Sequence, residues 1–151
     1  MSRRDELDRQ IVDSYRRVSR ELGRVLLPTL VDRGITMAQL KALMAVTAAG
    51  EQGVAVTVLG SELRIGQPSA SLLVEQLVRQ GLVTRTADRV DRRRVLVTAS
   101  PQGEEFADEL RLGRRSTLQE WLARLSDADA DALGQGLLAL EDAADNSGGP
   151  A

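Results

Sequence analysis

The order of patterns between Val54 and Gly103 constrains this chain more than any other feature of its sequence. Two short helical patterns come first, and a tight turn, Arg64-Ile65-Gly66, separates them. In the first pattern, apolar residues recur at the spacing of one buried helix face, at Val56, Leu59 and Leu63. The pattern predicts a helix over residues 57–63, and then a second helix that packs across it.

Two residues define how this first helix should begin and cross its neighbour. Thr57 is the predicted N-cap, because a threonine hydroxyl can accept a free N–H of the first turn. Gly60 lies where the two helices should cross, and a residue without a side chain allows a close approach there.

The second pattern predicts a helix that begins at Gln67-Pro68 and ends before Gly81. Proline is favoured in the first turn, where its missing N–H costs nothing, and glycine is favoured just past the last turn. Its expected buried stripe comprises Ala70, Leu73, Val74, Leu77 and Val78.

Short polar side chains lie opposite that stripe at the N-terminal end of the helix: Gln67, Ser69 and Ser71. A DNA-recognition helix places this end in the major groove, where Gln and Ser side chains can hydrogen-bond to base edges. The alternative interpretation is that these three residues only cap the helix and face solvent.

Two β-rich runs follow, and an arginine-rich loop joins them. Val83, Arg85 and Ala87 alternate along the first run, and Val95 and Val97 along the second. The loop over residues 88–94 carries four arginines, Arg89, Arg92, Arg93 and Arg94. Beside a helix-turn-helix, these guanidinium groups can reach phosphates or the minor groove, although an ordinary solvated loop tip is the alternative. We expect the acidic Asp91 to orient the arginines by bidentate pairing.

Helix, turn, helix and β-ribbon together predict a mainly α protein with a small β-wing, a winged helix-turn-helix. The run over residues 88–103, DRVDRRRVLVTASPQG, resembles the wing signature of MarR-type transcriptional regulators. In that family D-x-x-D-R-R is followed by a short strand and by L-T-x-x-G. The upstream run over residues 77–83, LVRQGLV, is similar to the end of the family's recognition helix. The resemblance covers residues 5–145 and is strongest over residues 59–103.

The sequence departs from the family pattern at two places. Ala99-Ser100 stands where Leu-Thr is usual, and Ser100 can still cap the next helix. Leu72 stands at a position that is often polar or basic in the family, which implies contact with a thymine methyl group. The resemblance implies that Arg64 holds DNA phosphates together with the wing arginines.

Composition disfavours several other classes of protein. At 151 residues the chain is expected to form one domain, and it contains no cysteine and no histidine. It therefore lacks thiolate ligands, disulfides and the commonest general base, so we expect neither an enzyme nor a bound metal or cofactor. No apolar run approaches the ~18 residues of a membrane span, and the N-terminus has no apolar signal core. These features predict a cytoplasmic protein with no membrane partner.

Charge is distributed unevenly along a chain whose formal net charge is only −2. Residues 53–98 carry seven basic and four acidic side chains, whereas residues 99–151 carry four basic and eleven acidic side chains. The positive charge thus lies on the expected reading unit, which is consistent with one face directed toward DNA. Ordinary solubility charge on surface helices is the alternative.

Long helices are expected on both sides of the reading unit. One covers residues 5–31, with Pro28 kinking or ending it. Another begins at Thr36, which forms a capping box with Gln39, and runs to about Ala49. Residues 50–53 should form a loop. Ser100-Pro101 should open a further long helix, residues 126–129 should cap a last one that ends near Ala144, and residues 146–151 should be a disordered tail.

These elements predict a division of labour along the chain. Residues 1–35 and 100–145 should form a helical dimerisation region, and residues 36–99 a winged helix-turn-helix DNA-binding domain. In the family that the chain resembles, the long N-terminal helix packs with the C-terminal helices of a second subunit. The expected interface residues are Leu7, Ile11, Leu118, Trp121, Leu122, Leu125, Leu133, Leu137 and Leu140.

The resemblance further implies an effector pocket between the first, second and fifth helices. Its candidate residues are Tyr15, Val18, Leu22, Met37, Leu40, Met44, Arg85 and Phe106. Such a pocket would suit a small apolar or aromatic acid, with an arginine for the carboxylate. The alternative is that nearly all of these residues belong to the core.

The sequence thus predicts a homodimeric, sequence-specific DNA-binding transcriptional regulator with a near-palindromic double-stranded operator. We expect a repressor that a small-molecule effector releases. The alternative is a winged-helix module that binds protein and has lost specific DNA binding.

Overall fold

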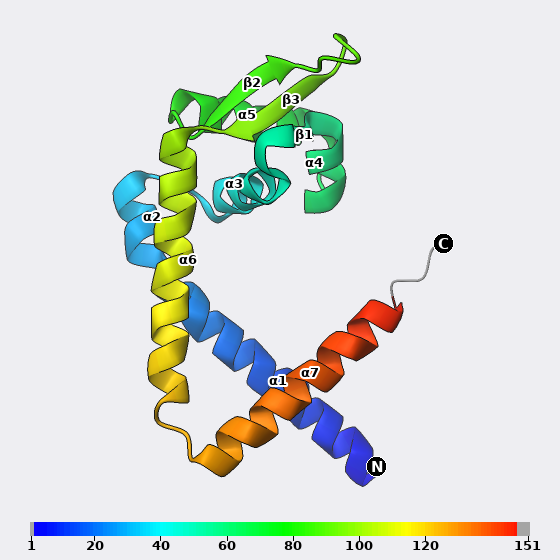
Figure 1. Cartoon of the computed structure of the whole chain (residues 1–151), viewed down its shortest axis with the longest axis vertical. Coiled ribbons are helices and arrows are strands. Elements are labelled where there is room, and N and C mark those ends of the chain that lie inside the picture. The colour runs from blue at the N-terminus through cyan, green and yellow to red at the C-terminus, as the bar shows by residue number, and fades with distance from the viewer. Residues whose placement is uncertain (1, 148–151) are drawn as a thin grey trace. The chain divides into compact units, whose positions relative to one another are not determined.

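The computed structural model describes residues 2–147 and places a small antiparallel sheet among helices (Figure 1). In chain order the elements are α1 (Arg3–Arg24), α2 (Leu27–Arg33), α3 (Met37–Ala49), the 3₁₀ turn η1 (Gly50–Gln52), β1 (Val54–Ala55), α4 (Val56–Leu63), α5 (Gln67–Arg79), β2 (Val83–Ala87), β3 (Val95–Ala99), α6 (Pro101–Leu122) and α7 (Asp127–Ser147). The chain divides into two compact units, Met1–Arg114 and Arg115–Ala151, and α6 runs from the first into the second. The expected fold class, mainly α with a β-wing, is confirmed.

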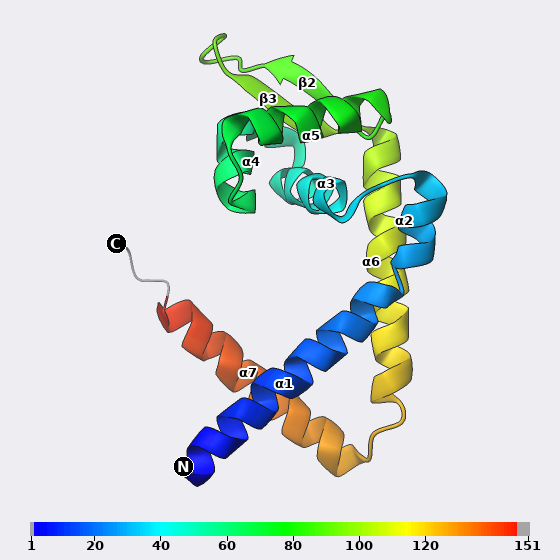
Figure 2. The ribbon, with the colours of Figure 1, turned by 180° about the vertical axis from the view of Figure 1, so that it is seen from behind.

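The core of the first unit surrounds α3. Leu43 and Val46 on this helix are fully buried, together with Leu59 of α4 and Leu77 of α5. Helices α3, α4 and α5 contact one another, and α5 also contacts β2 (Figure 2). The predicted capping box starts α3 where expected, since the N–H of Gln39 donates to Thr36 Oγ1 over 3.2 Å. The helices α3, α4 and α5 therefore share one continuous apolar core.

The sheet has the strand order β1-β3-β2, with both pairings antiparallel. The β2–β3 ribbon follows the predicted runs and ends at the pair Ala87–Val95. Strand β1 was not predicted, because residues 50–53 were expected to form a loop that led directly to a helix. Gly53 brings β1 onto β3 with a φ of +70°, and a Cβ there would lie 2.9 Å from the carbonyl oxygen of Val97. Only glycine fits this approach without strain.

The predicted single helix over residues 5–31 is wrong, because the chain turns after Arg24 and α2 begins at Leu27. Pro28 lies in the first turn of α2, where its missing N–H was free in any case, so it starts a helix instead of kinking one. The two helices also differ in how deeply their side chains are buried. Leu30 of α2 is buried, whereas α1 has no buried residue.

Helix α6 begins at Pro101 as predicted, and Ser100 caps it. Ser100 Oγ accepts the main-chain N–H of Gly103 over 3.0 Å, and its hydroxyl donates to the carbonyl of Gly81. Gly103 packs directly on the preceding chain, because a Cβ there would lie 1.9 Å from the carbonyl oxygen of Leu82. The turn after α5 and the start of α6 therefore meet at one close contact.

In the second unit, α7 begins where predicted, and Ser126 Oγ accepts the N–H of Asp129 over 3.1 Å. The helix continues to Ser147, so the predicted tail is wrong at Asn146 and Ser147. The rest of that prediction, residues 148–151, lies outside the described residues. Within residues 2–147, no helix combines the length and the apolar character needed to cross a membrane.

Candidate nucleic-acid interface

Helix α4 and the turn after it set the angle of the second helix. Helix α4 begins at Val56, so the prediction that Thr57 caps it is wrong; the N-cap is Ala55, without a side-chain hydrogen bond. Strand pairing of β1 fixes that end of the helix instead, which no local pattern reveals. At the other end Arg64 adopts a left-handed conformation with a φ of +55°. A Cβ on Gly60 would lie 3.2 Å from the carbonyl oxygen of Ile65, which agrees with the predicted close crossing.

Helix α5 begins at Gln67, with Pro68 in its first turn, as predicted. Its buried face comprises Ala70, Val74 and Leu77, and Gly81 turns the chain into β2 with a φ of +73°. The expected buried stripe is too wide by one residue, because Val78 is 39% exposed. The N-terminal end of α5 remains exposed at Gln67 and Ser69 and half-buried at Ser71.

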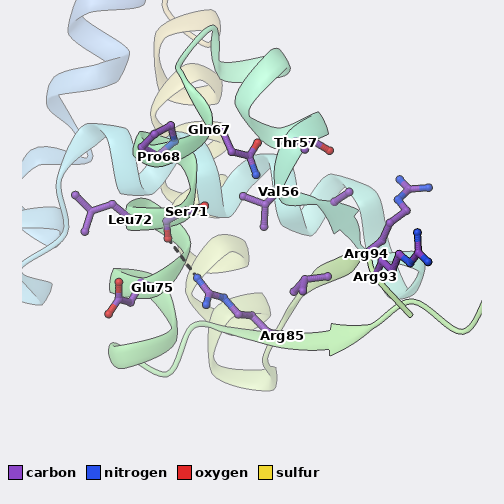
Figure 3. A pocket seen from close by; sticks show the side chains of 12 residues that line it. Val56, Thr57, Gln67, Pro68, Ser71, Leu72, Glu75, Arg85, Arg93 and Arg94 are labelled. Atoms are coloured by element: carbon purple, nitrogen blue, oxygen red, sulfur yellow. Dashed lines mark hydrogen bonds between the residues drawn. The ribbon is translucent and has the colours of Figure 1, made fainter. Parts of the chain in front are cut away.

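A groove of about 720 Å³ lies between α5 and the wing (Figure 3). It is lined by Ala55, Val56, Thr57, Gln67, Pro68, Ser71, Leu72, Glu75, Arg85, Arg93, Arg94 and Val95. Figure 3 shows Arg85 reaching from β2 toward α5, where its Nη2 donates to the main-chain oxygen of Ser71 over 3.3 Å. Polar side chains of the helix and arginines of the wing thus share one concave surface.

The wing loop is closed by its own hydrogen bonds. The N–H of Asp88 donates to the carbonyl of Arg94, and the N–H of Arg94 donates to the carbonyl of Asp91, each over 2.9 Å. Asp88 Oδ1 accepts the N–H of Val90 over 2.9 Å, and Asp91 Oδ1 accepts the N–H of Arg93 over 3.0 Å. The predicted bidentate pairing of Asp91 with an arginine is wrong. Asp91 orders the loop through a main-chain N–H, which leaves the guanidinium groups exposed.

In the part of the chain that the structure describes, the arginines of β2 and of the wing loop form no ion pair with a carboxylate, so their positive charge can attract a polyanion. Within residues 2–147, none of the ion pairs involves Arg85 or an arginine of the wing loop. The groove's one carboxylate, Glu75, is paired with Arg79 at the far end of α5. Uncompensated arginines at the mouth of a groove create a positive potential that attracts phosphate.

The groove brings together only some of the predicted DNA-binding residues. Gln67, Ser71, Leu72, Arg93 and Arg94 line it. Arg64, Ser69, Arg89 and Arg92 are exposed but do not line it. Sequence reasoning assigned Arg85 to an effector pocket and missed six other lining residues: Ala55, Val56, Thr57, Pro68, Glu75 and Val95. The strand alternation carried a signal for Arg85, because residues 83, 85 and 87 share one face of the ribbon and Val83 is buried on that face.

The residues expected around an effector lie in different surroundings. Leu40 and Phe106 are buried, whereas Tyr15, Val18 and Met37 are 68%, 46% and 43% exposed. Leu22 and Met44 are partly buried. Phe106 borders a second, smaller cavity of about 290 Å³, whose other lining residues are Arg33, Gln80, Leu82, Gln102 and Glu105. Arg85 and Phe106 thus line different cavities.

The expected interface residues are exposed on the single chain. Leu7 and Ile11 on α1 are 47% and 51% exposed. Leu118, Leu122, Leu125, Leu133, Leu137 and Leu140 are between 38% and 58% exposed, and Trp121 is partly buried. Among residues 2–147, no three His, Cys, Asp or Glu side chains are grouped as a metal site would require.

The sequence is similar to those of known transcriptional regulators. The model of the MarR family matches residues 33–94. An HTH-type transcriptional regulator of Mycobacterium tuberculosis is 32% identical over 99 residues, which are 66% of this chain and 68% of the relative. A relative from Mycobacterium bovis, also named as an HTH-type transcriptional regulator, matches with the same identity and coverage.

Solved structures resemble the whole fold. RV1404 of Mycobacterium tuberculosis superposes with a TM-score of 0.78 at 19% identity, covering 100% of this chain and 98% of its own. MepR of Staphylococcus aureus, in a structure described as a MepR–DNA complex, gives a TM-score of 0.70 at 21% identity, covering 85% of this chain and 96% of its own. At these identities the likeness concerns the fold alone.

Proposed function

Because the chain belongs to the MarR family of transcriptional regulators, we propose that it is a homodimeric, sequence-specific DNA-binding protein. We further propose that it represses transcription and that a small-molecule effector releases it from DNA. In this proposal the chain has no catalytic role and acts on chromosomal DNA in the cytoplasm.

The observation that carries the proposal is the shared groove between α5 and the wing. Gln67 and Ser71 stand at the N-terminal end of α5, and Arg93 and Arg94 lie in the wing loop just before β3, on the same groove. A helix of this kind presents its N-terminal end to the major groove, while flanking arginines hold phosphates or enter the minor groove. Leu72, which is 51% exposed, would contact a thymine methyl group.

The remaining predicted DNA contacts extend this footprint. Arg64, exposed in the turn before α5, and Arg89 and Arg92, exposed in the wing loop, would bind phosphates on either side of the groove. Ser69 is exposed on the first turn of α5 and would accept or donate a hydrogen bond at a base edge or a phosphate.

Exposed apolar side chains on α1, α6 and α7 support the homodimer. Leu133, Leu137 and Leu140 recur along α7 at helical spacing and are 42% to 58% exposed. On α1, Leu7 and Ile11 lie four residues apart and are exposed to a similar degree. Apolar stripes of this length on a single chain mark a surface that another chain covers. A two-fold dimer would place two recognition helices in successive major grooves about 34 Å apart, so the operator would be near-palindromic.

Effector release would work as a population shift. An effector lowers DNA affinity only if it binds better to the state in which the two recognition helices are wrongly spaced. The family resemblance favours an apolar or aromatic acid beside Leu22, Leu40 and Met44. A dimer seated on promoter DNA would occlude it, which favours repression over activation.

Fluorescence anisotropy against the DNA upstream of the protein's own gene tests the proposal. The wild type and the variants Gln67→Ala, Ser71→Ala and Arg93→Ala would be titrated at two salt concentrations, with Arg3→Ala as the charge-matched control on α1. Loss of a base contact should weaken specific binding about 5- to 150-fold. Loss of a phosphate contact should reduce the salt slope by about 1. Arg3→Ala should change neither quantity.

The result that would overturn the proposal is weak binding that ignores both salt and sequence, with all three interface variants silent. Selection of bound sequences from a pool of random DNA duplexes would then test whether the protein recognises a different operator. A failure of that selection would favour a winged-helix module that binds protein instead.

A further inference from the structure

Two side-chain hydrogen bonds tie the C-terminal half of α5 to the segment around the start of α3. Gln39 Nε2 donates to Gln76 Oε1 over 2.9 Å, and Gln80 Nε2 donates to the main-chain oxygen of Gly34 over 3.2 Å. Gln76 and Gln80 are four residues apart, so they project from the same side of the helix. The recognition helix is therefore held on two successive turns.

The capping box of α3 fixes the direction of the first bond. Gln39 Oε1 accepts the main-chain N–H of Thr36 over 2.9 Å, so only the Nε2 end of this amide remains available. Gln39 is only 6% exposed, and little water competes for its hydrogen bonds. The amide thus points toward Gln76 because α3 has already oriented it.

The two helices also pack through apolar side chains. Val74 and Leu77 of α5 belong to the same buried cluster as Leu40 and Leu43 of α3. Apolar burial is not directional, so on its own it permits a small rotation of one helix on the other. The nine residues from Gln76 back to Gln67 span about 13 Å of helix, so a rotation of about 5° at the tether moves the far end by about 1 Å. A shift of this size exceeds the distance range within which a hydrogen bond to a base edge forms.

We propose that Gln39 is a positioning residue for sequence discrimination. Through Gln76 it fixes the angle at which α5 presents Gln67 and Ser71 to the bases. The inference rests on the proposed function, because it takes α5 to be the helix that reads DNA. Neither Gln39 nor Gln76 lines the groove, and both act through α5 without touching a base.

The test compares specific with non-specific binding in variants of Gln76. Gln76→Met removes the acceptor and leaves the α3 cap intact, whereas Gln76→Glu keeps an acceptor for Gln39. Gln52→Met replaces an exposed glutamine in η1 and is the matched control. For each full-length variant, the dissociation constant is measured on the operator and on an unrelated duplex of equal length, at two salt concentrations.

We expect Gln76→Met to lose about tenfold in the ratio of the two affinities, which corresponds to about 1.4 kcal/mol. Its salt slope should stay unchanged, since the phosphate contacts remain. Gln76→Glu adds a negative charge and lowers both affinities, but it should keep the ratio. Gln52→Met should match the wild type.

A purely structural role for the pair would give a different result. It would lower the melting temperature and the active fraction, and it would weaken binding to both duplexes equally. A wild-type ratio in Gln76→Met therefore overturns the inference and leaves the proposed function standing. A wild type that does not discriminate between duplexes overturns the proposed function, and this inference with it.

A double-mutant comparison gives a second readout. Gln39→Met removes the bond from the Thr36 N–H to Gln39 Oε1 and the tether together, so it should lower both the melting temperature and the ratio. Adding Gln76→Met to it should cause no further loss of discrimination, because both changes remove the same bond. Additive losses would contradict the proposal.

Discussion

Arg85 Nη2 donates to the main-chain oxygen of Ser71 over 3.3 Å and so joins strand β2 of the wing to helix α5. A guanidinium has five N–H donors, and this bond uses one of them. Arg85 also lines the groove shared with Arg93 and Arg94. Arg85 can therefore link the wing to the helix and still contact a phosphate.

We expect Arg85→Ala to weaken operator binding about tenfold and to reduce the salt slope by about 1, as loss of one phosphate contact does. Anisotropy titrations at several salt concentrations measure both quantities. Arg3→Ala controls for the loss of one positive charge. An unchanged slope would mean that Arg85 only holds the wing to α5.

Substitutions of Asp91 should separate loop order from charge. Asp91 Oδ1 accepts the N–H of Arg93, and an asparagine oxygen can accept the same bond. Asp91→Asn should therefore bind DNA at least as tightly as the wild type, whereas Asp91→Ala should bind several-fold more weakly because the wing arginines lose their fixed positions. Equal DNA affinities for the two variants would show that the charge of Asp91, and not its hydrogen bond to the Arg93 N–H, determines the affinity.

Gly103 and Gly113 offer a matched pair of substitutions within α6. A Cβ at Gly103 would meet the Leu82 carbonyl oxygen at 1.9 Å, whereas one at Gly113 would meet nothing within 4 Å. Gly103→Ala should destabilise the fold by about 3 kcal/mol, the upper end of the usual cost of overpacking. Gly113→Ala should stabilise it by up to about 1 kcal/mol through helix propensity. Thermal unfolding of both variants measures this difference, and a reversed order would contradict the close contact at Leu82.

A charge on the apolar stripe of α7 should dissociate the proposed dimer. Leu137 is 50% exposed on the single chain, so Leu137→Glu should leave the helix content unchanged and shift sedimentation from dimer to monomer. Leu112→Glu, at a 64% exposed position of α6 outside the predicted interface, is the control and should remain dimeric. Dimers in both variants would refute this interface.

The N-terminal end of α1 should respond to acid. The main-chain N–H and the hydroxyl of Ser2 both donate to the carboxylate of Asp5 and hold its pKa below the ordinary value of 3.8. A carboxyl whose pKa is lowered by folding stabilises the folded state above its unfolded pKa and loses that effect as the pH falls through the folded pKa. The first turn should therefore fray below about pH 4. Amide exchange at residues 3–6 reports the fraying, and Asp5→Asn should abolish its pH dependence.

Local patterns identified the elements whose limits are set by single residues. The bounds of α5 follow from Pro68 and Gly81, and the start of α3 follows from its capping box, so both were predictable. Pro28 shows the limit of the same reasoning. A proline can end one helix or begin the next, and the burial of Leu26 and Leu30 against the core decides between these outcomes.

Features that depend on distant pairing were not predictable from local patterns. Strand β1 has two residues, too few for any periodicity, and only its register with Val97 and Leu96 defines it. Ala55 becomes the N-cap of α4 for the same reason. The strand face on which Arg85 lies was predictable, but its hydrogen-bond partner was not. The alternation of β2 puts it on the face of Val83, but the helix carbonyl that it meets is known only from the packing of α5 on β2.

The β2–β3 ladder ends at Ala87 and Val95, so the seven residues 88–94 lie beyond the last strand pair and are ordered by their own hydrogen bonds. Natural variation there can lengthen, shorten or recharge the wing without moving a single core side chain. Under the proposed function, selection can thus change the phosphate contacts of the wing while leaving α5, the helix proposed to read bases, unchanged. Binding strength and sequence preference would then evolve separately.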